Sequence, residues 1–204
     1  MHLRTLLMLM PLLTVPSEAL ASGAELAAIP LTVRIYGGSR LTETTREEAL
    51  AVAARALADA GIDTLWRRCD AAGPDDGCAS PPSPHELIVR LVSPHTPVST
   101  RVTLGDALVE GGTGSGQLAT VYVDRVRSLA RAASVEVAKL LGYAIAHELG
   151  HLLLSTTAHA PDGLMRARWS EAHIRRARTA DWNFTTTEIA VIRARRRGQI
   201  VWSE

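Results

Sequence analysis

The chain has 204 residues, of which 47% are hydrophobic and 21% charged, and its 22 basic and 21 acidic side chains leave a net charge of +1. This composition is typical of a globular domain and excludes disordered, collagen-like and coiled-coil proteins. The near-neutral charge and an aromatic content of 4% provide neither the basic surface nor the stacking platforms that nucleic-acid binding needs. We therefore expect no nucleic-acid partner.

Residues 1–21 have the pattern of a secretory signal peptide. A positively charged start precedes an apolar run over residues 5–15, and Ala19-Leu20-Ala21 has the small-x-small form after which signal peptidase cuts. A membrane-spanning helix needs about 20 apolar residues, so we do not expect this shorter run to remain as an anchor. The pattern predicts a secreted or periplasmic protein with no stable membrane association and one mature domain over residues 22–204.

The mature chain opens with a strand-helix-strand pattern. Residues 31–36 alternate between apolar and polar side chains as a strand does, and residues 62–66 form a second short apolar run. Between them, residues 42–60 are predicted to form a helix. This segment begins with threonines that can cap it and with two acidic residues that favour its first turn, and its apolar side chains then recur at helical spacing. This order predicts that the two strands are parallel neighbours.

Cys69 and Cys78 are the only cysteines, and they flank a loop rich in proline, glycine and aspartate. In an exported chain we expect them to form a disulfide, with two free thiols as the alternative. A bridge that closes a loop of about ten residues stabilises a fold by about 2–3 kcal/mol. Its expected role is structural.

Two further strands and three helices are expected after the cysteine loop. These elements are strands at 86–92 and 118–123, a short helix or turn at 124–132, a long helix at 135–155 and a final helix at 186–197. The glycine-rich run at 111–116 lacks the Lys-Ser/Thr ending of a phosphate-binding loop, so we expect a hinge or a surface turn. The strand at 118–123 is either an edge to which a peptide substrate adds or an ordinary buried strand.

The long helix contains the sequence His147-Glu148-Leu149-Gly150-His151. Residues four apart lie on one face of a helix, about 6 Å apart along its axis, so both imidazoles can reach one metal ion. Glu148 projects about 100° further round the helix, where it can touch a water on that ion. Burying two histidines and a glutamate in so apolar a segment costs free energy unless a ligand or hydrogen bonds satisfy them. A core helix with hydrogen-bonded histidines is the alternative.

A catalytic zinc ion usually has three protein ligands and leaves one position to water. The first histidine after the helix is His159, and residues 159–165 contain a proline and a glycine that favour a chain reversal beneath the helix. We expect His159 to be the third ligand. Asp162 is the alternative, and Thr157 is a poor zinc donor.

The motif resembles that of the metzincin clan of zinc peptidases. His147, Glu148 and His151 match its helical signature, and Gly163-Leu164-Met165 is similar to its methionine turn. The match then departs from the clan pattern at Leu154, where the clan has glycine, and at Thr157, where it has the third histidine. On this alignment His159 supplies the third ligand from two residues later. The chain is also similar to secreted bacterial proteins of this kind.

The resemblance implies a single α+β domain, in which a small, mixed, twisted sheet packs with the active-site helix, the methionine turn and a C-terminal helix. It also implies a monomeric zinc endopeptidase that hydrolyses peptide bonds through a zinc-bound water activated by Glu148. Met165 is then a structural floor beneath the histidines, and Ala167 stands where some members carry a tyrosine. The alternatives are a non-catalytic zinc-binding module and an exported domain that binds no metal.

Overall fold

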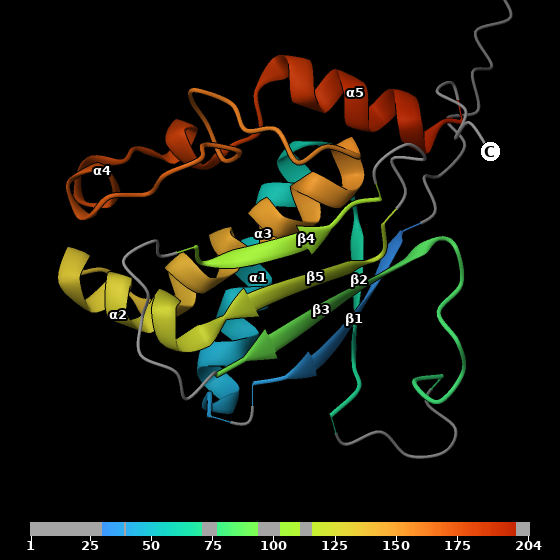
Figure 1. The fold of residues 1–204 in the computed structure, drawn as a ribbon, viewed down its shortest axis with the longest axis horizontal. Coiled ribbons are helices and arrows are strands. Elements are labelled where there is room, and N and C mark those ends of the chain that lie inside the picture. Colours follow the sequence, from blue (N-terminus) through green and yellow to red (C-terminus); the bar gives the residue numbers. More distant parts are fainter. Residues whose placement is uncertain (1–29, 39, 71–76, 94–102, 111–115, 199–204) are drawn as a thin grey trace, which may run out of the picture.

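The structure of the chain is a computed structural model that describes residues 30–38, 40–70, 77–93, 103–110 and 116–198 (Figure 1). The predicted signal peptide lies outside these residues, as does most of the glycine-rich run. Within the described ranges, no helix combines the length and the apolar character needed to cross a bilayer.

Five strands form one mixed sheet. They are β1 (Leu31–Gly37), β2 (Thr64–Arg68), β3 (Glu86–Val92), β4 (Gly105–Leu108) and β5 (Leu118–Tyr122), in the spatial order β2-β1-β3-β5-β4. The first four in this order are mutually parallel, which confirms the predicted pairing of β1 with β2. β4 pairs antiparallel with β5 and forms one edge of the sheet.

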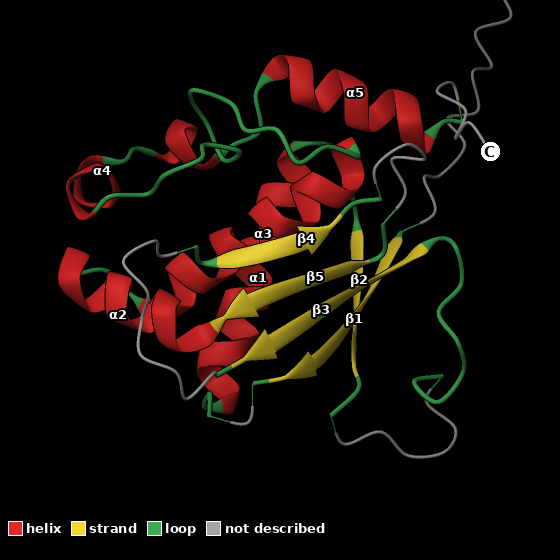
Figure 2. Ribbon diagram, viewed as in Figure 1, coloured by secondary structure: helices red, strands yellow, loops and turns green. Residues whose placement is uncertain are grey.

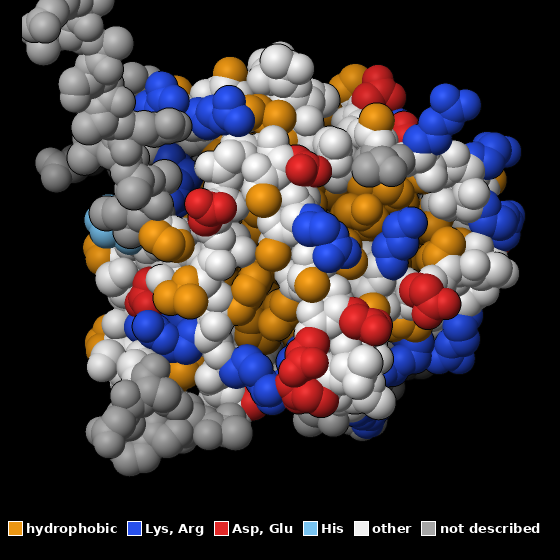
Figure 3. All heavy atoms as spheres, turned by 180° about the vertical axis from the view of Figure 1, so that it is seen from behind, with side chains coloured by type: hydrophobic (Ala, Val, Ile, Leu, Met, Phe, Trp, Pro, Cys, Tyr) orange, Lys and Arg blue, Asp and Glu red, His pale blue; other side chains and the backbone are white. Residues whose placement is uncertain are grey.

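The helices are α1 (Glu43–Asp59), α2 (Val123–Ala133), α3 (Val137–Leu154), α4 (Glu171–Arg176), the 3-10 helix η1 (Thr179–Trp182) and α5 (Thr186–Arg196). Of these, α1 and α3 lie directly behind the sheet, whereas α4 and α5 lie beyond the edge formed by β4 (Figure 2). Seen from behind, the helical layer carries acidic and basic side chains close together (Figure 3). This mixture agrees with the near-neutral net charge of +1.

Two predictions about the strands need correction. The strand expected at 118–123 is β5, which lies between β3 and β4, so it cannot be the edge to which a substrate adds. The edge is β4, which was not predicted, because four residues that begin with glycine show no strand periodicity and form a strand only by pairing with β5. The long helix begins at Val137 rather than at residue 135, after a left-handed residue, Ser134, ends α2.

The two faces of the sheet differ in character. On the helical face, inward side chains such as Val33, Val89 and Val121 are fully buried against α1 and α3. On the open face, Arg34 donates to Glu86 Oε2 (2.6 Å) and to the carbonyl oxygen of Ser80 (2.6 Å). These bonds hold the segment after Cys78 against the sheet, and they satisfy a buried ion pair.

The structure joins Cys69 to Cys78 by a disulfide with a Cα–Cα distance of 5.5 Å. The bridge lies beyond the end of β2, and Tyr36 on the open face donates a hydrogen bond to the carbonyl oxygen of Cys78 (3.5 Å). The predicted pair is therefore formed, and Cys78 lies on the side of the sheet away from the helices.

Candidate metal centre

The candidate site is built on the second half of α3. This helix is strongly apolar, yet it contains three buried polar residues: His147, Glu148 and His151 are only 8%, 5% and 5% exposed. The helix ends at Ser155, whose φ of 52° is left-handed and turns the chain back. Leu154, which stands where the metzincin pattern has glycine, therefore remains helical, because the next residue makes the turn.

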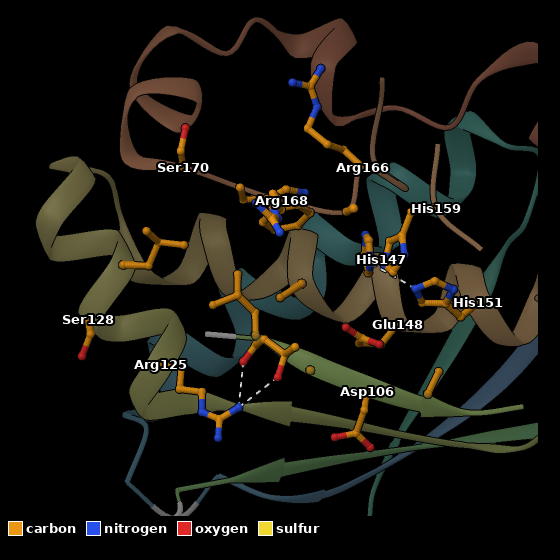
Figure 4. Close-up of a pocket in the computed structure, with 18 of the residues that line it drawn as sticks. Asp106, Arg125, Ser128, His147, Glu148, His151, His159, Arg166, Arg168 and Ser170 are labelled. Atoms are coloured by element: carbon orange, nitrogen blue, oxygen red, sulfur yellow. Dashed lines mark hydrogen bonds between the residues drawn. The ribbon is translucent and has the colours of Figure 1, made fainter. Parts of the chain in front are cut away.

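The chain returns beneath α3 through a tight reversal. Thr156 N–H donates to the carbonyl oxygen of His151 (3.1 Å), and Ala160 N–H donates to that of Met165 (2.9 Å). Met165 is 1% exposed, under the helix. The reversal brings His159 back to the face of α3 that carries the two helical histidines (Figure 4).

Three imidazoles meet at this point. One potential ligand atom from each of His147, His151 and His159 can be chosen so that all three lie within 4.8 Å of one another. Asp162, the alternative third ligand, instead accepts a hydrogen bond from Arg166 Nη2 (3.0 Å), and its side chain is 79% exposed. The geometry thus favours His159 over Asp162.

Both helical histidines are oriented by backbone carbonyls. His147 Nδ1 lies 2.7 Å from the oxygen of Leu164, and His151 Nδ1 lies 2.8 Å from that of Thr156. A carbonyl only accepts hydrogen bonds, so the proton of each neutral ring is on Nδ1 and the lone pair is on Nε2. The two rings therefore direct their metal-binding nitrogens at the same space.

The two Nε2 atoms lie 3.2 Å apart. With a lone pair on each, this separation is unfavourable unless a cation lies between them. A proton is a poor candidate, because burial lowers the pKa of His147 to about 4 and also lowers that of His151. Tetrahedral zinc, with Zn–N bonds of about 2.0–2.1 Å, places two ligand nitrogens about 3.3–3.4 Å apart. The donor set and its spacing therefore fit a zinc ion.

Glu148 lies between α3 and the edge strand β4. A Cβ atom placed on Gly105 would be 2.6 Å from Glu148 Oε1, so glycine at this position leaves room for the carboxylate. Burial, followed by the charge of Asp106, raises the pKa of Glu148 to about 8. Asp106 itself points to the open face, where it accepts a hydrogen bond from the Tyr122 hydroxyl (2.5 Å).

A cleft of about 680 Å³ opens on the three histidines and Glu148. Its walls come from β4, from α2 and from residues 166–171, which follow the buried methionine (Figure 4). Its apolar lining includes Leu104, Leu129 and Trp169. An extended chain can therefore pass between β4 and the histidines with apolar surface on one side of them.

Trp169 is a site residue that the sequence did not reveal. Its indole meets the His147 ring edge-on (centroids 5.5 Å apart) and meets Trp182 in the same way (5.0 Å). Trp182 in turn stacks on Tyr143 of α3 (4.4 Å). In the sequence, Trp169 is a single tryptophan four residues after Met165. Its position beside His147 could not be predicted without knowing the path of the chain reversal.

Comparison with known proteins identifies the fold. No protein-family model matches the chain, and no curated protein matches it. The structure is similar to that of archaemetzincin from Methanopyrus kandleri, with a TM-score of 0.52 over 85% of this chain and 98% of that chain, at 14% sequence identity. The predicted fold class, an α+β fold with a mixed sheet similar to that of archaemetzincin, is confirmed.

Proposed function

We propose that the chain is a zinc-dependent endopeptidase. The observation that carries this proposal is the pair of buried Nε2 lone pairs 3.2 Å apart on His147 and His151, beside a buried carboxylate that faces a cleft. A helix stabilised only by packing gains nothing from this arrangement, because each polar group raises the free energy of burial. The archaemetzincin-like fold supports the same conclusion.

His147, His151 and His159 are the residues that would hold the ion. When bound there, zinc supplies a Lewis acid that polarises a peptide carbonyl and lowers the pKa of a water molecule to about 7. Met165 is buried against α3 at Gly150, between the two helical histidines, which suits the structural role that the resemblance implies.

Glu148 is the proposed catalytic residue. Its carboxylate takes a proton from the attacking water and then delivers that proton to the nitrogen of the leaving amine. Its position between α3 and β4 places it beside any peptide that lies along this edge. The buried setting favours both proton transfers, because it moves the pKa of the carboxyl group towards neutrality. Such a group accepts a proton more readily than an exposed glutamate does, and it releases the proton more readily than water does.

The substrate is proposed to add to β4 as an extended strand. Tyr122 N–H donates to the carbonyl oxygen of Leu104 (2.8 Å), so alternate residues from Leu104 onward direct their backbone groups at β5. The residues between them, Gly105 and Ala107, direct theirs away from β5, toward the cleft. Such a free edge binds an extended peptide through main-chain hydrogen bonds.

We further propose that the protein acts outside the cytoplasm, as a monomer whose mature domain spans residues 22–204. The disulfide between Cys69 and Cys78 supports an oxidising compartment. Residues 1–21 would then be the signal peptide that directs export.

The test compares mature wild-type protein with the Glu148→Gln variant, both loaded with zinc. We expect about one zinc per chain in each, cleavage of an unstructured protein by the wild type, and a loss of at least about 1,000-fold in kcat for the variant. Equal cleavage by the two proteins contradicts the mechanism. Zinc in both proteins with cleavage in neither identifies the chain as a non-catalytic zinc-binding module.

A further inference from the structure

Two large apolar side chains stand out on the described surface. Leu108 is 62% exposed and Leu65 is 53% exposed. Leu108 ends β4 and Leu65 lies on β2, so the two occupy opposite edges of the sheet. An exposed leucine on a sheet edge promotes unwanted pairing unless a partner covers it, so each of them calls for an explanation.

Leu108 belongs to an apolar row across the open face. It pairs with Leu118 of β5, and Leu118 pairs with Ile88 of β3. These three point away from the helices, because their neighbours Ala119 and Val89 point into the helical core with no exposure. The row becomes less exposed from Leu108 inward, since Leu118 and Ile88 are only partly exposed.

Leu65 has no such row. Its partner across the pairing of β2 with β1 is Thr32, and the next residue of β2 on the open face is Arg67, which bonds Glu86 (2.9 Å). Leu65 is thus a single exposed leucine beside polar neighbours, which is common on protein surfaces. It provides a matched control for Leu108.

The apolar row shares the edge strand β4 with the proposed active site. β4 begins at Gly105, where a Cβ atom would touch Glu148, and ends three residues later at Leu108. A strand rises about 3.3 Å per residue, so Leu108 lies about 10 Å along the edge from Gly105, which adjoins Glu148. A peptide strand on this edge directs every second side chain to the open face, where the row lies.

We infer that Leu108, backed by Leu118 and Ile88, is a specificity-determining residue that binds an apolar side chain of the substrate about three residues from the scissile bond. This inference rests on the proposed peptidase function. The occupant is an extended peptide segment, because β4 offers a backbone edge and the apolar row ends on that edge in the exposed side chain of Leu108. Pairing of the substrate covers Leu108, which accounts for its exposure in the free protein.

The experiment uses a peptide series in which one leucine is moved along an otherwise alanine- and serine-containing sequence. Cleavage by zinc-loaded wild type, Leu108→Thr and Leu65→Thr is mapped by mass spectrometry, and binding is measured on the zinc-loaded Glu148→Gln form of each. Threonine retains strand propensity while it removes the apolar tip of leucine. Circular dichroism and sedimentation check that all variants are folded and monomeric.

For wild type we expect leucine about three residues from the cut to raise both kcat/KM and affinity about tenfold, the effect of burying roughly half a leucine side chain. Leu108→Thr should abolish this preference, whereas Leu65→Thr should retain it and leave the values for the leucine-free peptide unchanged. Equal losses for all peptides, equal behaviour of the two variants, or a change of oligomeric state confined to Leu108→Thr would overturn the inference.

The outcomes also separate this inference from the proposed function. Peptide binding that depends on Leu108, with no cleavage by any form, supports the recognition surface and contradicts the peptidase. Cleavage that is insensitive to Leu108 supports the peptidase and contradicts the recognition surface.

Discussion

Gly150 of α3 lies directly against Met165, so that a Cβ atom at position 150 would come within 2.5 Å of the methionine sulfur and 2.8 Å of the Phe184 ring. The absence of a side chain at Gly150 therefore lets the returning segment pack against the helix between its two histidines. That segment includes Leu164, whose carbonyl oxygen orients His147.

This contact predicts the effect of Gly150→Ala. In an exposed helix interior the change stabilises a protein by about 1 kcal/mol, because alanine is the better helix former. Here we expect destabilisation by about 1–3 kcal/mol, as for overpacked cores, together with weaker zinc binding. Denaturant titration of the metal-free protein and competition with a chelator measure the two effects. Lys139→Ala, at an exposed position of α3, is the control; higher stability of Gly150→Ala would contradict the packing described.

The third ligand is tested by a pair of alanine variants. His159→Ala should lower zinc affinity by more than about 100-fold. Removing a group that only hydrogen-bonds a metal ligand costs up to about 100-fold, and removing the ligand itself costs more. Asp162→Ala should leave affinity unchanged, since Asp162 bonds Arg166 on the surface. Zinc content after dialysis against a graded chelator distinguishes them, and the reverse order of affinities would make Asp162 the ligand.

The pH dependence of the metal-free protein follows from two buried groups with opposite signs. The pKa of His147 is lowered to about 4, so stability is lost as the pH falls below 6.5 and the unfolded chain takes up a proton that the fold does not. The pKa of Glu148 is raised to about 8, so stability is lost as the pH rises from 4.5 to 8 and the unfolded chain releases a proton that the fold retains.

Between pH 4.5 and 6.5 the effects of His147 and Glu148 on the free energy of unfolding cancel. His151, whose pKa is also lowered, adds stability as the pH rises to 6.5, so the free energy of unfolding has its maximum near pH 6.5. Between pH 6.5 and 8 only Glu148 contributes, and we expect a loss of about 2 kcal/mol. Urea titrations of metal-free wild type and Glu148→Gln measure it. A decline of equal size in the variant would assign the effect to another group.

The disulfide is expected to affect stability but not the metal. Replacing Cys69 and Cys78 together by serine should lower the free energy of unfolding by about 2–3 kcal/mol. Cys78 and Ser80 are held against the open face by Tyr36 and Arg34, whereas the histidines lie beyond the opposite face. Zinc affinity should therefore match that of the wild type. A parallel loss of affinity would show that the two faces are coupled.

The helical part of the site could be predicted because its geometry is local. The spacing of His147 and His151 fixes their common face in any α-helix, and the apolar flanks predicted the helix itself. The strand-helix-strand opening followed from periodicity for the same reason. The disulfide could be predicted because the chain has only two cysteines and carries the pattern of an export signal.

The remaining parts depend on contacts between distant segments. β4 has four residues and exists through pairing with β5, and Trp169 reaches His147 only after the chain has reversed beneath α3. The end of the helix was predicted to within one residue, at 155 against Leu154, although Ser155 takes the left-handed conformation usually given to glycine. The family pattern at Leu154 therefore could not locate the turn.

The carbonyl groups that orient His147 and His151 belong to Leu164 and Thr156, both of which follow α3 in the chain. The helix alone thus carries the ligands without fixing their rings. During folding, the ion can be captured tightly only after the segment beyond the helix has docked. If the site binds zinc as proposed, zinc uptake reports completion of the fold, and a chain that is clipped after α3 should not acquire the metal.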